Sequence, residues 1–205
     1  LVYLFFDLMH EATEQTGGRE VTSGVVFLGS LGVSFVGLVA LESSQVFGGR
    51  SGNRMLSLPY MIAVGMGLHN LGEGLAIGAS YASGEYTLSA LLVAGFGLHN
   101  GTEGFGIVGA AGKTPMSWRD VFLLGLIAGL PTCVGTFLSG QGVSSYFSIC
   151  FYALAAGSLL YVVLSLTVMS YTATRRVQVA AGMFAGISLM YVTAMVLALV
   201  SGVRS

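Results

Sequence analysis

Charge is what this sequence has least of. Only 8% of its 205 residues are charged, whereas 54% are hydrophobic and the mean hydropathy is +0.83. A soluble domain carries about a quarter charged residues, so this chain is too poor in charge to cover itself with a water-facing surface. Its formal net charge of -1 also excludes the basic face that a nucleic-acid partner requires.

The sequence has only two cysteines, and its first residues do not resemble a signal peptide. The two cysteines, Cys133 and Cys150, lie in apolar stretches, and we expect two separate buried thiols rather than a disulfide. No basic segment precedes the apolar residues 1–6, which argues against a signal peptide. Those residues resemble the end of a hydrophobic helix, so we expect further chain before Leu1.

Long apolar segments fill most of the chain. A transmembrane helix needs about 20 mostly apolar residues, and the stretches between polar links here have that length. They predict an all-α fold, a polytopic transmembrane helix bundle forming one domain over residues 1–205, with the lipid bilayer as its surroundings. The segments are a partial helix at 1–12 and whole helices at 24–47, 56–80, 86–110, 120–143, 146–171 and 178–201.

Basic residues predict how the chain is oriented. Six of the eight lie in or beside the loops 48–55, 111–119 and 172–177, and the other two are Arg19 and Arg204. These three loops alternate along the chain, so they fall on one face of the membrane. Because cytoplasmic loops carry the excess of Lys and Arg, we expect the three loops in the cytoplasm of a plasma or inner membrane protein.

A ten-residue motif occurs twice inside these apolar segments. Residues 65–74 read GMGLHNLGEG and residues 95–104 read GFGLHNGTEG, an offset of 30 with seven identical positions. His and Glu four residues apart share one face of a helix. The short link at 81–85 makes the two helices antiparallel, so their motifs can lie at similar depth and face each other.

Facing motifs of this kind predict a metal site. A charge near the bilayer centre costs several kcal/mol unless it is paired or hydrated, and two facing carboxylates repel. A divalent cation between them removes the repulsion, and mixed nitrogen and oxygen ligands suit zinc, ferrous iron, manganese and cadmium. A lone intramembrane His is usually a packing residue, but two copies favour ligation. The glycines 65, 67, 95 and 97 are expected to serve close helix packing.

At these motifs the sequence resembles the ZIP (Zrt/Irt-like protein) family of divalent-metal transporters. Residues 69–74 (HNLGEG) are similar to its fourth-helix motif, residues 99–104 to its fifth-helix motif, and the stretch FDLMHEA at 6–12 to the end of its second helix. The resemblance implies an eight-helix fold from which helix one and most of helix two are absent here. The spans above are then helices three to eight, and a homodimer is implied by the same resemblance.

The resemblance also implies which residues bind metal. One ion would use His69, Glu73, His99 and Glu103, and a second would use Asn70 and Asn100 with the same two carboxylates. The sequence departs from the family where Gly72 and Thr102 replace proline, and a threonine there can bond back to its own helix. Thr132 and Ser165 stand where relatives often have further ligands. The predicted metal residues are therefore His69, Asn70, Glu73, His99, Asn100 and Glu103.

The predicted function is passage of a divalent cation across the membrane. The metal ion is then the transported substrate, zinc first, with iron, manganese and cadmium as other candidates, and no enzymatic residue is expected. Two alternatives stay open. One is a relative that binds metal without moving it, as a sensor or subunit. The other is an intramembrane zinc hydrolase, although no HExxH sequence is present.

A polar cluster lies near the start of the chain. We interpret Asp7, His10 and Glu11 as a solvated helix end, with capture of an entering cation as the alternative.

Overall fold

The computed structural model describes all residues except 17–20, 45–55, 142–143, 172–175 and 202–205. Its described part contains seven α-helices and no strand, which confirms the predicted all-α bundle. The loops 48–55 and most of 172–177 lie outside the described residues. The helices are α1 (Val2–Thr16), α2 (Val21–Ser43), α3 (Ser57–Ala82), α4 (Tyr86–Gly109), α5 (Trp118–Ser139), α6 (Ser145–Tyr171) and α7 (Arg176–Ser201).

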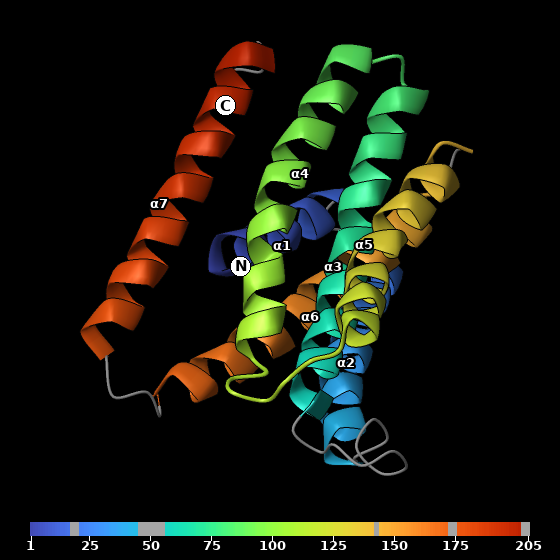
Figure 1. Cartoon of the computed structure of the whole chain (residues 1–205). Coiled ribbons are helices and arrows are strands. Elements are labelled where there is room, and N and C mark those ends of the chain that lie inside the picture. Colours follow the sequence, from blue (N-terminus) through green and yellow to red (C-terminus); the bar gives the residue numbers. More distant parts are fainter. Residues whose placement is uncertain (17–20, 45–55, 142–143, 172–175, 202–205) are drawn as a thin grey trace.

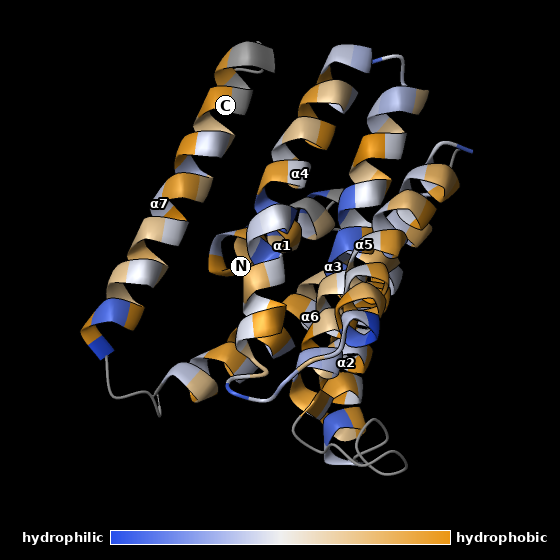
Figure 2. Ribbon diagram, in the orientation of Figure 1, coloured by the Kyte–Doolittle hydropathy of each residue, from blue (hydrophilic) through white to orange (hydrophobic). Residues whose placement is uncertain are grey.

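Helix α3 is the centre of the bundle. Sixteen of its 26 residues are buried, more than in α2, α4 or α5, because it packs against α4, α5 and α6. Helices α2 and α1 complete the bundle by packing on α6, whereas α7 stands at the edge beside α4 (Figure 1). The hydrophilic residues of α3 and α4 fall near the middle of each helix (Figure 2), so polar side chains are enclosed by apolar neighbours.

Four of the described helices are long and apolar enough to cross a membrane: α2, α5, α6 and α7. Helices α3 and α4 do not reach the same hydropathy, although the sequence predicted spans there. Both exceed 20 residues in length, but each carries a His, an Asn, a Glu and several glycines. The His and Glu side chains of α3 and α4 are buried against other helices. These two helices can therefore be less apolar than the helices around them.

Glycines bring α3 and α5 into backbone contact. A Cβ on Gly67 would overlap the carbonyl oxygen of Ile127, and one on Gly74 would overlap that of Thr132. The Ile127 carbonyl is the group that Pro131 leaves without its helical N–H partner. Close packing was expected of Gly67 and is present, but the same expectation is wrong for Gly97, whose Cβ would meet nothing within 4 Å.

The start of α5 is fixed by a capping box. The Ser117 hydroxyl accepts from the Asp120 N–H at 3.2 Å, and the Asp120 carboxylate accepts from the Ser117 N–H at 3.0 Å. Each satisfies an N–H that the helix leaves free, so α5 begins at Trp118 rather than at the predicted residue 120. Tyr60 of α3 donates to the same carboxylate at 2.9 Å, which ties the two helix starts together.

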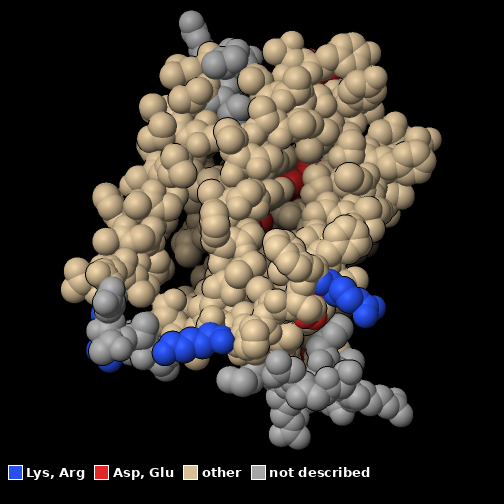
Figure 3. Space-filling view, in the orientation of Figure 1, with Lys and Arg blue, Asp and Glu red and all other residues tan. Residues whose placement is uncertain are grey.

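The described basic side chains gather at one end of the molecule (Figure 3). They are Lys113 in the link after α4, Arg119 at the start of α5 and Arg176 at the start of α7. The turn between α3 and α4 lies at the opposite end (Figure 1). The other basic residues lie outside the described part of the chain.

The two cysteines are separate, as expected. Cys150 on α6 is half-buried and accepts a hydrogen bond from the Ser30 hydroxyl at 3.3 Å. Cys133 on α5 is exposed, so the prediction that it is buried is wrong. It borders the hollow between α4 and α5 instead of the packed core.

Candidate metal site

The two copies of the motif lie side by side on α3 and α4. Gly84, with a φ of +81°, lets the chain reverse within three residues, so the helices are antiparallel and adjacent. All four His and Glu side chains of the motifs are buried, with exposed fractions of 1% for His69, 3% for Glu73, 8% for His99 and 9% for Glu103. Local helix periodicity and one tight turn therefore place four side chains that could bind a metal in the interior.

Glu73 is the hub of the cluster. Its Oε1 lies 3.2 Å from Nε2 of His69 and also contacts Nε2 of His99. Its Oε2 accepts a hydrogen bond from Asn100 Nδ2 at 2.8 Å. Two of these three contacts cross from α4 to α3, and the two imidazole rings stack with centroids 6.4 Å apart. One carboxylate thus holds both helices and both histidines together.

Three side chains of this cluster can share one cation. One ligand atom each from His69, Glu73 and His99 all lie within 4.8 Å of one another, and all three residues are buried. Two imidazole nitrogens and a carboxylate oxygen are ligands that zinc and neighbouring transition metals accept. The same atoms that form hydrogen bonds in this structure would serve as the ligands.

Glu103 is close to the cluster but not bonded to it. Its Oε1 lies 3.8 Å from Nε2 of His69, and neither of its buried carboxylate oxygens has a hydrogen-bond partner among the described residues. A buried ionised group is costly unless it is paired or binds a metal. Glu103 is therefore the side chain of the cluster with the greatest capacity left for a cation.

Hydrogen bonds fix the orientation of the side-chain amides of Asn70 and Asn100. Asn70 Nδ2 donates to the carbonyl oxygen of Ala128 on α5 at 3.0 Å, and Asn100 Nδ2 donates to Glu73. A carbonyl and a carboxylate accept hydrogen bonds but do not donate them, so the amide nitrogen must face them in both cases. Among the described residues, the oxygens Oδ1 of both asparagines are consequently left buried and without a hydrogen-bond partner.

The structure brings most of the predicted residues together. His69, Glu73, His99 and Asn100 are in direct contact and Glu103 is adjacent, whereas Asn70 is held by α5. The Ala128 carbonyl could not be predicted from the sequence, because no residue type marks a main-chain acceptor. The expected back-bond of threonine is present, since Thr102 donates to the His99 carbonyl at 2.6 Å.

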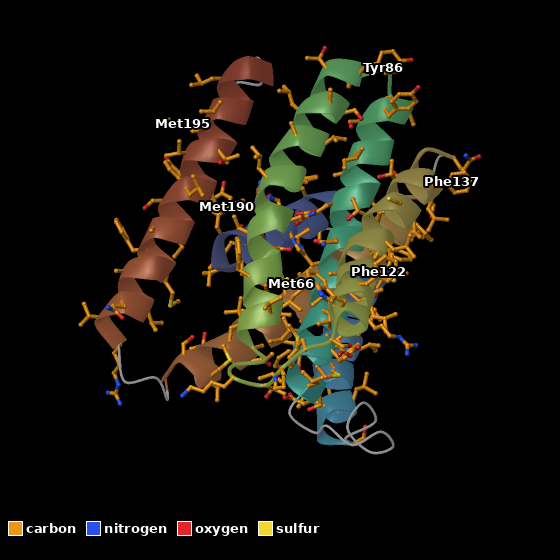
Figure 4. All side chains as sticks on the ribbon, viewed as in Figure 1. Met66, Tyr86, Phe122, Phe137, Met190 and Met195 are labelled. Carbon is orange, nitrogen blue, oxygen red and sulfur yellow. The ribbon has the colours of Figure 1, made fainter. Side chains whose placement is uncertain are left out.

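Three hollows in the described part of the structure border the cluster, and two of them reach Glu103. The larger hollow, of about 1020 Å³, lies between α4 and α5 and is bordered by Asn70, Asn100 and Glu103. In Figure 3, Asp and Glu atoms are visible between the other residues near the middle of the view. A smaller one, of about 420 Å³, reaches His99 and Glu103 from the side of α7. Met190 of α7 belongs to its wall and lies toward α4 in Figure 4.

Thr132 and Ser165, which stand where relatives often have further metal ligands, lie apart from each other. Thr132 borders the larger hollow beside Asn70. Ser165 lies instead with Glu42 and Tyr161 around a separate hollow of about 440 Å³ between α2 and α6. Ser165 is therefore not part of the cluster.

Comparison with known proteins finds a human protein that is similar to this chain. No protein-family model and no solved structure matches the chain. The chain is similar to the human zinc transporter ZIP4. Identity is 34% over 131 residues, which cover 62% of this chain and 20% of that protein. The chain thus matches about a fifth of the length of this relative. The relative is a zinc transporter, and zinc accepts the nitrogen and oxygen ligands that the buried cluster offers.

Proposed function

We propose that this protein carries a divalent metal cation across a membrane and that it is a transporter of the ZIP type. The observation that carries the proposal is the buried cluster of His69, Glu73 and His99, whose ligand atoms come from two antiparallel helices in the middle of an apolar bundle. Polar and ionisable residues at such a depth mark ion pathways. The similarity to the human zinc transporter supports the same conclusion.

The composition of the cluster suits a transported ion. A resident structural zinc has four fixed protein ligands, whereas here three ligand atoms converge. Further oxygens of Glu103, Asn70 and Asn100 stand nearby and accept no hydrogen bond from the described residues. An ion can therefore exchange one set of oxygens for another as it passes. Zinc is the first candidate substrate, and ferrous iron, manganese and cadmium accept the same donors.

A flux measurement on the reconstituted protein tests the proposal. Proteoliposomes containing the wild-type chain should take up zinc, and Glu73→Ala and His69→Ala should abolish uptake. The chain offers a matched control, because His10 and Glu14 on α1 have the same spacing and lie 3.5 Å apart but are solvent-exposed. Variants His10→Ala and Glu14→Ala should keep wild-type flux.

The alternatives give different outcomes in the same experiment. Zinc binding that depends on His69 and Glu73 without any flux identifies a metal-binding protein that does not transport. Turnover of a peptide or lipid ester without flux identifies a hydrolase. Uptake that survives both Glu73→Ala and His69→Ala shows that the cluster is not the transport site.

A further inference from the structure

The smaller of the two hollows that reach Glu103 lies on the side of the cluster that faces α7. Its volume is about 420 Å³, and its wall comes from Leu1 and from helices α1, α3, α4 and α7. His99 and Glu103 border it from α4. The hollow of about 1020 Å³ reaches Glu103 from the side of α5 instead. The two hollows therefore meet the cluster from different helices.

Two methionines border the smaller hollow together with His99 and Glu103. Met66 comes from α3 and is fully buried, and Met190 comes from α7, where it lies toward α4 (Figure 4). Of the three hollows that border the cluster in the described part of the chain, this is the one with methionine in its wall. Thioether sulfur is polarisable and prefers soft metal ions such as Cu(I). The hollow thus offers a kind of ligand that the His and Glu cluster lacks.

The position of Met66 in the motif places it beside the cluster. It stands three residues before His69 and seven before Glu73, so it shares their face of α3. In the second copy of the motif, Phe96 has the same position, and its ring packs edge-on against His99 with centroids 5.5 Å apart. The first copy therefore places a sulfur atom where the second places an aromatic ring.

The cluster leaves two groups at this hollow available to another ion. Nε2 of His99 contacts Glu73, which leaves Nδ1 as the ring nitrogen for a second ion. Glu103 has two buried carboxylate oxygens that accept no hydrogen bond from the described residues. Buried charges are stable when they are paired or bind a metal. A single carboxylate balances the charge of one monovalent cation.

The rest of the wall favours an ion of low charge. It is mainly apolar and includes Leu4, Leu98 and Leu189. The Born cost of moving an ion out of water rises with the square of its charge, so apolar walls penalise a divalent cation more than a monovalent one. Sulfur ligands and apolar walls together select a soft monovalent cation, whereas the nitrogen and oxygen ligands of the cluster suit zinc.

We propose that this hollow is a second metal site, which binds a soft monovalent cation of the Cu(I) or Ag(I) class. Its ligands are the sulfurs of Met66 and Met190, Nδ1 of His99 and a carboxylate oxygen of Glu103. Methionine has three rotatable bonds, so both sulfurs can turn toward the ion while the helices stay in place. Zinc would use Nε2 of the two histidines, so both ions can be bound together. The site goes beyond the proposed transport function, because it requires binding alone.

X-ray absorption at the silver edge tests for the sulfur ligands. Silver is the probe because its +1 state is stable in air. A Cys133→Ser/Cys150→Ser background leaves methionine as the source of sulfur in the chain. After zinc has been bound and one equivalent of silver added, the silver spectrum should show sulfur neighbours. A first shell of nitrogen and oxygen without sulfur overturns the proposal, and this result needs no methionine variant.

Silver titrations assign the sulfur to this hollow. In the same background, Met66→Leu/Met190→Leu should weaken silver binding by about tenfold or more, because the soft ligands are lost. Leucine is close to methionine in volume, so the zinc affinity should keep its wild-type value. The control is Met183→Leu/Met195→Leu, which changes two exposed methionines of α7 outside this hollow and should leave silver affinity unchanged. Equal silver affinity in the two double variants contradicts the proposal.

A single variant guards against misfolding of the double variant. Met190 lies on α7 at the edge of the bundle (Figure 1), so Met190→Leu leaves the core around Met66 intact. It should also weaken silver binding, and an unchanged affinity again contradicts the proposal.

The outcomes separate this site from the transport function. If the wild-type chain moves no zinc but binds silver through Met66 and Met190, the transport function fails and the soft-metal site stands. If the chain moves zinc and silver binding does not depend on these methionines, the soft-metal site is wrong and the transport function stands.

Discussion

Matched glycines in the two copies of the motif should respond oppositely to the same substitution. Gly67 and Gly97 occupy the same position in the repeat, as do Gly74 and Gly104. On α3, a Cβ at Gly67 or Gly74 would overlap a carbonyl oxygen of α5, whereas on α4 a Cβ at Gly97 or Gly104 would meet nothing within 4 Å. Alanine therefore forces α3 and α5 apart but leaves α4 undisturbed.

The expected size of this difference follows from the structure. The overlap involves backbone atoms, which cannot rotate away as a side chain can, so overpacking should cost about 1 to 3 kcal/mol. Replacing glycine by alanine inside a helix also gains about 1 kcal/mol in helix propensity. That gain is shared by both members of a pair and cancels when they are compared. Gly67→Ala should therefore be less stable than Gly97→Ala by about 1 to 3 kcal/mol.

Thermal unfolding in detergent micelles, followed by circular dichroism, measures the difference. In a chain of this size, 1 kcal/mol corresponds to about 2 to 4 °C in Tm, so Gly67→Ala should melt at least about 2 °C below Gly97→Ala. The pair Gly74→Ala and Gly104→Ala should behave in the same way. Equal melting temperatures within both pairs would refute the close packing of α3 on α5.

Three further outcomes are expected. Glu73→Gln should destabilise the metal-free protein because it weakens contacts with two histidines and Asn100. Glu103→Gln should stabilise it, because it removes a buried carboxylate that accepts no hydrogen bond. Melting curves in chelator measure both effects, and a Tm change of the same sign in both variants contradicts the structure. Zinc at 100 times its Kd should raise stability by about 2.7 kcal/mol, and a Tm shift that persists in a His69→Ala/His99→Ala variant would place the ion elsewhere. Ser117→Ala should cost about 1 kcal/mol by removing the cap of α5, and an unchanged Tm would show that the capping box contributes nothing.

Much of this arrangement could be predicted from the sequence, because membrane helices depend on local properties. Apolar length predicted helices in every segment, and the spacing of His and Glu placed each pair on one face. The short link at 81–85 made the two motif helices antiparallel. These three facts together predicted that the two motifs lie side by side and face each other.

What the sequence did not reveal depends on contacts between distant segments. The repeat treats Gly67 and Gly97 as equivalent, but only α3 packs against α5, so identical residues differ in their surroundings. The direction of Asn70 is set by a main-chain oxygen of Ala128, which no residue pattern indicates. Glu73 and Glu103 are likewise equivalent in the repeat, yet their surroundings differ. Glu73 contacts three side chains, whereas Glu103 lies 3.8 Å from His69 and has no hydrogen-bond partner among the described residues.

X-ray absorption at the zinc edge identifies the ligands of the bound ion. In the zinc-loaded protein, we expect nitrogen and oxygen ligands at about 2.0 to 2.2 Å, with outer-shell scattering from two imidazoles that falls to one in His99→Ala. Sulfur ligands at about 2.3 Å, or a spectrum that His99→Ala leaves unchanged, would contradict a metal site formed by His69, Glu73 and His99.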